Sequence, residues 1–169
     1  GPHDHADLLL DSGATLRFND PRRFGSILWG GKTPETHPLL LSMGPEPLSA
    51  SFTGRYLHDL SRGRRAPVKH FLMDSRVVPG VGNIYANEAL YLAGIHPLRA
   101  AGRISLPRYE RLVLAVREVL RNAINMGGTT LRDFVGGDGR PGYFRQSLHV
   151  YGRGGEPCHR CGRMLTEKR

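Results

Sequence analysis

The sequence lacks most of the features that would place it in a membrane or outside the cell. It contains only two cysteines, which cannot form the disulfide framework of a small secreted domain, so a reducing compartment is the default expectation. No apolar run approaches the ~20 residues of a membrane-spanning helix, and the first residues carry no signal-peptide pattern. These absences predict a cytoplasmic protein that does not enter a membrane.

Acidic residues are also scarce. Asp and Glu number 15 against 24 Lys and Arg in a chain of 169 residues, which gives a formal net charge of +9. A basic surplus of this size favours a polyanionic partner, either nucleic acid or an anionic membrane surface. A solvated basic surface without a target is the alternative. The apolar fraction of 39% is high enough to form a core, which argues against a disordered chain.

The hydrophobic pattern changes along the chain from short strands to helices. Apolar and alternating runs predict strands at residues 6–10, 14–19, 25–29 and 143–151. Helical periodicity predicts helices at residues 51–60, 66–74, 83–93 and 106–125. Gly94 is a typical residue to end the third helix, and Ser105 can cap the fourth, whose apolar stripe is a core face. The β part gives way to the helical part somewhere in residues 30–50.

A glycine-rich corner precedes the helix that is predicted to begin at Asn83. Gly80 and Gly82 lack a β-carbon, so the backbone there can approach a ligand closely. The free N–H groups at the start of the helix can bind an anion. In a chain this basic, the expected anion is a nucleic-acid phosphate, and an ordinary corner between two helices is the alternative.

Two arginine-rich segments could also contact nucleic acid. Arg22 and Arg23 precede Phe24 in a turn, where arginines could hold a backbone and the ring could enter a base stack. In the alternative, Phe24 packs inward and the arginines are solvated. The basic run at 62–65, followed by Lys69, lies at a helix start and opposes the helix dipole. An external anion would compensate for that charge, but a solvated surface explains it equally well.

Cys158 and Cys161 have the spacing of zinc ligands. One pair supplies half of a tetrahedral site, and the usual companion pair lies about 15–20 residues further on, beyond Arg169. The alternatives are an inert pair of thiols, or a site completed by His149 or His159. No arrangement of a nucleophile with a base stands out elsewhere.

Taken together, these segments resemble the formamidopyrimidine-DNA glycosylases, a family of bacterial enzymes that excise oxidised purines. The resemblance is collinear and covers nearly the whole chain. The segments that carry it are 3–5, 20–25, 72–74, 80–88, 93–97, 127–134, 141–144, 150–153 and 157–162.

The resemblance implies an α+β fold in three parts. Residues 1–30 would be the last strands of a β-sandwich catalytic domain, and residues 31–135 a helix–two-turns–helix DNA-binding domain. Residues 136–169 would be a base-capping loop and an incomplete zinc-ribbon β-hairpin. The family protein would hold one zinc ion, with Cys158 and Cys161 as half of its site.

The implied activity is base-excision repair of 8-oxoguanine and formamidopyrimidines. In the family, an N-terminal proline attacks C1′ of the damaged nucleoside and the adjacent glutamate is the acid and base. The resulting Schiff base leads to strand cleavage, which is the AP lyase step. Pro2 is not the first residue and no glutamate follows it. We therefore expect a fragment of a longer enzyme that has no catalytic residue of its own, is inactive alone and mainly binds DNA.

The resemblance also implies a set of DNA-contacting residues, which are His3, Arg22, Phe24, Arg64, Lys69, Asn83, Arg132 and Tyr151. Arg22 and Phe24 would fill the gap left by the flipped base, with Arg22 facing the orphaned cytosine. Asn83 would bind phosphate beside the lesion, supported by Lys69. Arg132 and Tyr151 would lie near the pocket for the extruded base.

The implied partner is damaged double-stranded DNA, bound by a monomer in the bacterial cytoplasm at the nucleoid. The alternative is a non-enzymatic nucleic-acid-binding module of the helix–two-turns–helix or helix–hairpin–helix type. A turn that inserts a wedge and a loop that caps a base distinguish the two, because a protein that binds only the backbone needs neither.

Overall fold

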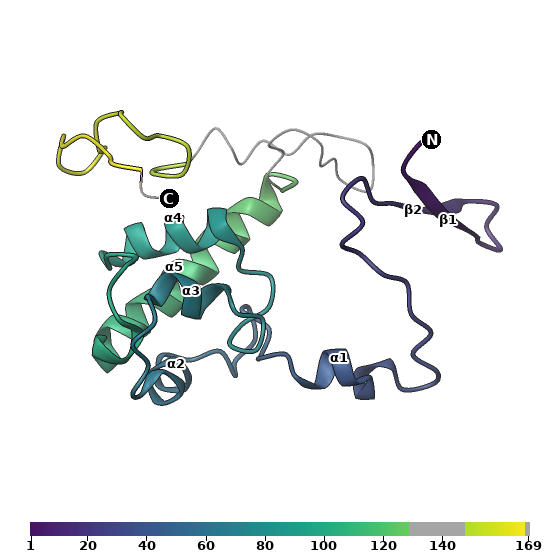
Figure 1. The fold of residues 1–169 in the computed structure, drawn as a ribbon, viewed down its shortest axis with the longest axis horizontal. Helices are drawn as coiled ribbons and strands as arrows, with labels where there is room; N and C mark the ends of the chain where they lie inside the picture. Colours follow the sequence, from purple (N-terminus) through teal and green to yellow (C-terminus); the bar gives the residue numbers. More distant parts are fainter. Residues whose placement is uncertain (129–147, 168–169) are drawn as a thin grey trace. The chain divides into compact units, whose positions relative to one another are not determined.

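The computed structural model describes residues 1–128 and 148–167. The chain divides into two compact units, Gly1–Leu41 and Ser42–Arg169. Figure 1 follows the chain from the strands of the first unit to the helices of the second. The division falls within residues 30–50, where the sequence pattern changes from β to helical.

The first unit contains a two-stranded antiparallel hairpin, β1 (Asp4–Leu9) and β2 (Thr15–Asn19). Arg17 on β2 donates two hydrogen bonds of 2.8 Å to the Asp7 carboxylate on β1. This cross-strand pair matches the register, in which the two residues are directly opposite. A short 3₁₀ helix, η1 (Pro34–Thr36), and a single helical turn, α1 (Pro38–Leu41), follow. The first two predicted strands are confirmed to within two residues.

The predicted third strand at 25–29 is wrong. The described residues form a sheet of two strands only, and the side chains of Ile27, Leu28 and Trp29 are exposed. An apolar run marks a segment that favours burial, but a strand exists only where a neighbouring strand accepts its hydrogen bonds. Among the described residues, no strand pairs with this run.

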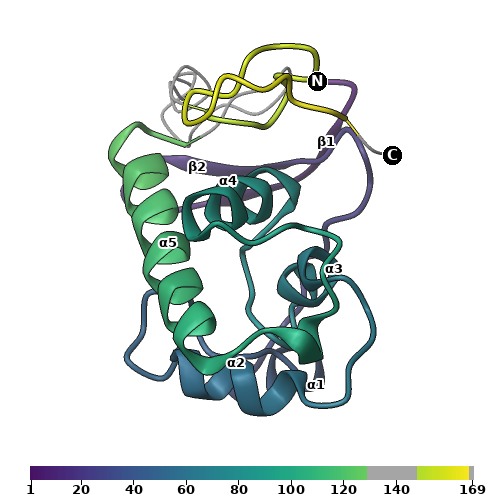
Figure 2. The same cartoon turned by 90° about the vertical axis from the view of Figure 1, so that its left-hand side faces the viewer.

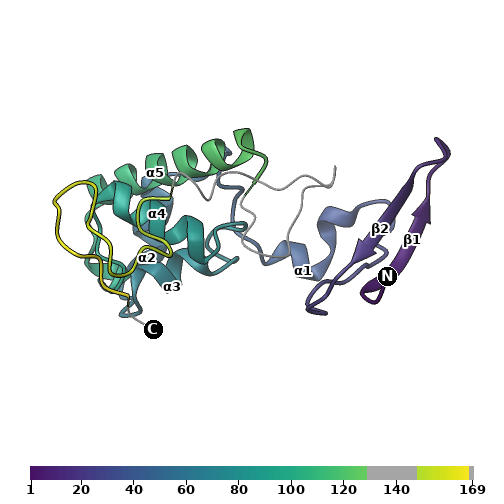
Figure 3. The same ribbon diagram turned by 90° about the horizontal axis from the view of Figure 1, so that it is seen from above.

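The second unit is helical, with α2 (Gly54–Ser61), α3 (Val68–Met73), α4 (Asn83–Ala93), η2 (Ala101–Arg103) and α5 (Leu106–Asn125). The long α5 packs against α4 and α2, while α3 packs against α4. Figures 2 and 3 show α4 lying beside α5. The predicted bounds of α4 and α5 are confirmed. Thr53 caps α2 through its side chain, which accepts the Tyr56 N–H at 3.1 Å, so this helix begins later than predicted.

The core of the second unit forms along the apolar stripe of α5. Tyr109, Leu112 and Val116 are almost completely buried, as the stripe predicts, whereas Ile124 near the end of the helix is exposed. Ser105 is at the N-cap position, but its side chain makes no capping hydrogen bond. Gly54 brings α2 close to α5, because a β-carbon there would lie 2.6 Å from the Glu110 backbone nitrogen.

The C-terminal segment of the second unit, residues 148–167, contains an isolated antiparallel bridge between Pro157 and Met164. The strand predicted at 143–151 is not formed where the structure describes it, at residues 148–151. Its remaining residues, 143–147, lie outside the described part of the chain. Within the described ranges, no helix is both long enough and apolar enough to cross a membrane.

Candidate nucleic-acid interface

The corner before α4, residues 78–82, is held in place by buried valines and has free space around its glycines. Val78 and Val81 are buried, which anchors the loop. Gly80 has a φ of +77°, a left-handed conformation that favours glycine. A β-carbon at Gly80 or Gly82 would meet nothing within 4 Å, so a ligand has room to approach. The predicted geometry of this corner is therefore present.

The N-terminus of α4 has no anionic partner in its own first turn. Gly82 is the N-cap and supplies no side-chain hydrogen bond, and the first turn contains no acidic residue. The first helical bond runs from the Ala86 N–H to the Gly82 carbonyl at 2.9 Å. The earlier N–H groups and the positive end of the helix dipole can thus act on an external anion.

Three of the sequence-predicted DNA contacts line one groove. It has a volume of about 740 Å³ and lies between α4, the turn that follows α4, and the C-terminal segment. Lys69, Asn83 and Tyr151 all line it, although they come from three separate segments. Asn87 and Arg160 line it as well, and the sequence reasoning did not single them out. The groove therefore combines a helix N-terminus, amide groups and cations.

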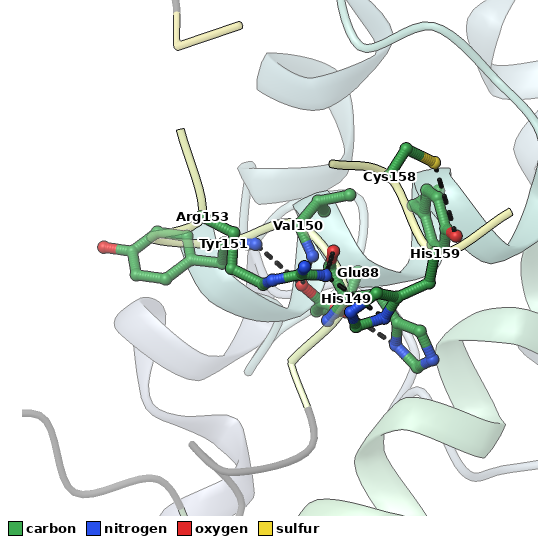
Figure 4. Close-up of polar contacts among 8 residues, drawn as sticks. Glu88, His149, Val150, Tyr151, Arg153, Cys158 and His159 are labelled. Atoms are coloured by element: carbon green, nitrogen blue, oxygen red, sulfur yellow. Dashed lines mark hydrogen bonds and ion pairs between the residues drawn. The ribbon is translucent and has the colours of Figure 1, made fainter. Parts of the chain in front are cut away.

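Glu88 joins α4 to the C-terminal segment, as Figure 4 shows. Its carboxylate is buried and accepts backbone N–H groups from three consecutive residues, His149 at 2.8 Å, Val150 at 2.9 Å and Tyr151 at 2.9 Å. These bonds explain why residues 148–151 form no strand, since the N–H groups that would pair with a neighbouring strand are used by Glu88. Sequence reasoning missed this role. The available signal was that Glu88 is the single charged residue of α4.

Side chains around Glu88 add further contacts between α4 and the C-terminal segment and within that segment. His149 Nδ1 lies 3.1 Å from a carboxylate oxygen of Glu88, and the imidazole stacks on Tyr91 with ring centroids 5.4 Å apart. Arg153 donates to the His149 carbonyl at 2.7 Å and to the Pro157 carbonyl at 3.1 Å. Figure 4 shows the Arg153 side chain reaching toward His149. The C-terminal side of the groove is therefore held by polar contacts.

The cysteine pair lies in a tight hairpin next to the groove. The Cys158 N–H donates to the Arg163 carbonyl at 2.8 Å, and the Gly162 N–H donates back to the Cys158 carbonyl at 2.9 Å. The Arg160 N–H points at Cys158 Sγ over 3.4 Å. Backbone hydrogen bonds to this sulfur, first from Arg160 and then from Cys161, lower the pKa of Cys158 to about 7. The thiolate is the form that binds metal.

The described residues contain no complete metal site. Cys158 and Cys161 are free thiols, and no group of three or more His, Cys, Asp and Glu residues in the described ranges could hold a metal ion. The alternative in which His149 or His159 completes the site is therefore wrong for this conformation. His159 Nδ1 instead accepts from Arg153 at 3.1 Å. A tetrahedral zinc site needs two further ligands.

The arginine–aromatic turn of the first unit is ordered by Asp20. Its carboxylate accepts the Gly25 N–H at 2.6 Å and the Arg22 N–H at 3.1 Å, and these backbone bonds, led by Gly25, lower the pKa of Asp20. Phe24 is 81% exposed, with the Arg22 guanidinium 4.8 Å from its ring centroid. The alternative in which Phe24 packs inward is therefore wrong. His3 lies in the same hairpin, where its carbonyl accepts the Asp20 N–H at 3.0 Å.

Arg64 lies in a second hollow of the helical unit. The hollow has a volume of about 450 Å³, and Arg64, Arg65 and Arg103 line it. Arg64 Nε donates to the Leu60 carbonyl at 3.0 Å, and its guanidinium lies 5.3 Å from the Phe71 ring centroid. Among the described residues, no acidic side chain lines the hollow, so it is a basic site. Arg132, the remaining predicted contact, and the predicted base-capping loop lie outside the described residues.

These features define a helical domain with an open helix N-terminus beside a groove and a second hollow lined by arginines. Comparison with known proteins makes the assignment specific. The family model described as "Formamidopyrimidine-DNA glycosylase H2TH domain" matches residues 43–135, where H2TH denotes helix–two-turns–helix. The chain belongs to this family.

Similar proteins extend the match over the rest of the chain. Formamidopyrimidine-DNA glycosylase of Hahella chejuensis is 62% identical over 165 residues, covering 98% of this chain and 61% of that protein. The enzyme of the same name from Alkalilimnicola ehrlichii is 62% identical over 169 residues, covering 100% of this chain and 61% of that protein. The chain thus spans about three fifths of the length of the curated relatives it matches.

Solved structures show the same fold. The MutM (Fpg) protein of Thermus thermophilus superimposes with a TM-score of 0.87 at 43% identity, covering 99% of this chain and 64% of that chain. Lactococcus lactis Fpg in complex with DNA that contains an abasic site gives a TM-score of 0.84 at 31% identity, covering 99% and 61%. The predicted α+β class and the predicted helix–two-turns–helix domain are confirmed. The domain bounds and the roles of individual site residues stay predictions.

Proposed function

We propose that this chain is part of a bifunctional DNA glycosylase and AP lyase that removes 8-oxoguanine and formamidopyrimidines from damaged double-stranded DNA, and that the chain itself supplies DNA binding. The observation that carries the proposal is the groove that combines the start of α4 with Lys69, Asn83 and Tyr151. The names of the relatives support the reaction. The complex of the Lactococcus lactis protein with abasic-site DNA supports the partner.

In this proposal, a DNA phosphate binds at the N-terminus of α4. The N–H groups of the first turn and the Asn83 amide donate to its oxygens, and Lys69 supplies a positive charge. Such charge-assisted hydrogen bonds are stronger than neutral ones. Tyr151 borders the same groove, and Glu88 fixes its backbone.

The hairpin of the first unit has a different role in this proposal. The exposed ring of Phe24, with Arg22 beside it, enters the gap that a flipped nucleotide leaves. Filling the gap offsets part of the unstacking free energy, which amounts to a few kcal/mol. His3 contacts the backbone from the same hairpin, and Arg64 contacts it from the helical unit.

We assign no catalytic residue to this chain. The family nucleophile is an N-terminal proline followed by a glutamate, and no position of this sequence matches both features. The expected behaviour of the chain alone is DNA binding without excision of 8-oxoguanine and without an adduct that borohydride traps. Trapping at the rate of a full-length relative would contradict this part of the proposal.

For zinc, we propose that Cys158 and Cys161 provide two of four ligands, with the remaining pair from outside the described residues. Zinc bound there would cross-link the hairpin and would be structural. Metal analysis of the purified chain tests this. Zinc near one equivalent that survives a chelator would show that a full ligand set exists within the chain. We further propose that the protein acts as a monomer at the bacterial nucleoid.

The test of the binding site is the affinity of the chain for duplex DNA, measured by fluorescence anisotropy over a range of salt concentrations. Affinity should fall steeply with salt, with a log–log slope of about −0.9 for each phosphate contacted. Asn83→Ala should weaken binding to damaged and undamaged duplexes alike, by about tenfold.

The matched control is Asn122→Ala, which removes an exposed amide from α5 on a surface that does not line the groove. Its affinity should equal that of the unchanged chain. An Asn83→Ala variant that binds as tightly as this control would show that the corner before α4 is only structural.

A further inference from the structure

Asn87 lies one helical turn after Asn83 and makes two hydrogen bonds to it. Asn87 Nδ2 donates to the main-chain carbonyl of Asn83 at 2.9 Å and to the Asn83 side-chain Oδ1 at 3.2 Å. Both residues line the groove. Asn87 is half-buried, and Asn83 is exposed at the start of α4.

The pair of bonds determines the orientation of both amides by chemistry alone. A main-chain carbonyl only accepts hydrogen bonds, so the Asn87 atom next to it must be the donor, Nδ2. That same atom faces the Asn83 side chain, which must therefore present its own acceptor, Oδ1. The opposite rotation of either amide would place two donors or two acceptors against each other.

The Asn83 donor is consequently turned away from its own helix. With Oδ1 held by Asn87, Nδ2 is on the other side of the amide, and no described residue accepts a hydrogen bond from it. A phosphate oxygen only accepts, so it can pair with Nδ2 and is repelled by Oδ1. The orientation of this amide therefore decides whether Asn83 attracts or repels a phosphate.

We propose that Asn87 is a positioning residue that presets the Asn83 amide with its N–H groups toward the DNA phosphate. The inference rests on the function proposed above, because it assumes that Asn83 binds phosphate. Without Asn87, the Asn83 side-chain amide would rotate between two orientations, one with Nδ2 and one with Oδ1 toward the phosphate. DNA binding would then have to select the orientation with Nδ2 toward the phosphate. Removing Asn87 should reduce DNA affinity less than removing Asn83 itself, because the Asn83 donor is still present and only its orientation is no longer fixed in advance.

A double-mutant cycle on duplex affinity tests the proposal. Asn87→Ala should weaken binding by about fivefold when Asn83 is present, and should have almost no effect when it is combined with Asn83→Ala. Alanine favours a helix more than asparagine does, so the variant should fold, and its thermal unfolding midpoint should not fall. Equal losses in both backgrounds would overturn the proposal, because they would mean that Asn87 acts on DNA directly or on the fold.

Asn87→Asp provides the sharper comparison. Aspartate has the same shape as asparagine but only accepts, so the Asn83 amide would rotate, give its donor to Asp, and turn Oδ1 toward the phosphate. Binding should weaken more than in Asn87→Ala. The added negative charge also repels DNA, and the same substitution in the Asn83→Ala background measures that repulsion separately. A loss of equal size in both backgrounds would assign the whole effect to charge and contradict the proposal.

The cycle separates failure of this inference from failure of the proposed function. If Asn83→Ala leaves the affinity unchanged, the phosphate site itself is wrong. If Asn83→Ala weakens binding but Asn87→Ala does not, the site stands and only the positioning role of Asn87 is wrong. The ¹⁵N resonance of the Asn83 side-chain amide adds a direct readout in the free chain. It should shift in Asn87→Ala, and an unchanged resonance would contradict the orienting bond.

Discussion

The backbone N–H of Tyr151 donates to Oε1 of Glu88 at 2.9 Å, which ties the C-terminal segment to the middle of α4. A buried carboxylate is stable only when hydrogen bonds replace its lost hydration. Glu88 is 1% exposed, and the N–H groups of residues 149–151 satisfy it. The helix whose start carries Asn83 and the segment that carries Tyr151 are therefore joined directly where both border the groove.

Replacing Glu88 should destabilise the chain substantially. Glu88→Ala leaves three backbone N–H groups without their acceptor, at a cost in unfolding free energy of roughly 3 kcal/mol. Glu88→Gln keeps one acceptor oxygen and should cost less. Denaturant unfolding measures both. Glu118→Ala is the control, because Glu118 is exposed on α5 and its loss should change stability by no more than about 0.5 kcal/mol. Equal costs for Glu88→Ala and Glu118→Ala would refute the anchoring role.

Phe24→Ala should reduce the preference of the chain for a duplex with an abasic site over an intact duplex. The ring is exposed and free to stack in a gap between bases, and stacking of this kind changes affinity by about tenfold. Trp29→Ala is the matched control, since Trp29 belongs to the same unit and is also exposed, at 92% against 81% for Phe24. Competition binding with the two duplexes gives the preference. If both variants reduce it equally, general apolar contact explains the effect rather than a wedge.

Removing Arg65 and Arg103 together should weaken DNA binding by more than the loss of two positive charges elsewhere on the chain would. Both line the hollow of Arg64, and no acidic residue of the described ranges borders it. If each contacts a phosphate, the log–log salt slope should become less steep by about 0.9 for each residue. Arg111→Ala with Arg121→Ala removes the same charge from exposed positions of α5. A slope that changes equally in the two double variants would show only a net-charge effect.

The turn that carries Phe24 should lose its backbone hydrogen bonds to Asp20 at acidic pH. Hydrogen bonds from the Gly25 and Arg22 backbone lower the pKa of Asp20 in the folded chain. A carboxyl group whose pKa is lowered by folding contributes its full stabilisation at pH values above its pKa in the unfolded chain, which is about 3.9. This contribution is lost as the pH falls through the lower folded value. The amide proton shift of Gly25 should therefore stay constant from neutral pH down to about pH 4 and move only below it. A transition near neutral pH would contradict the assignment.

Sequence patterns that involve residues close together in the chain predicted α4, α5 and the glycine-rich corner before α4 well. The bounds of α4 and α5, the stop at Gly94 and the open start at Asn83 depend on contacts within a few residues. The expected strand at 25–29 failed because a strand depends on a partner that its own residues do not specify. Glu88 was missed for a related reason, since its hydrogen-bond partners lie 61–63 positions away in the sequence.

In the function proposed above, the groove at the start of α4 binds the DNA backbone. Titration of the ¹⁵N-labelled chain with a short duplex that contains an abasic site tests it most directly. The largest amide shifts should occur at Lys69, Asn83 and Tyr151, whereas exposed positions of α5 such as Leu114 and Glu118 should stay unchanged. Shifts confined to α5, or no shifts at the groove while the duplex is bound, would contradict it.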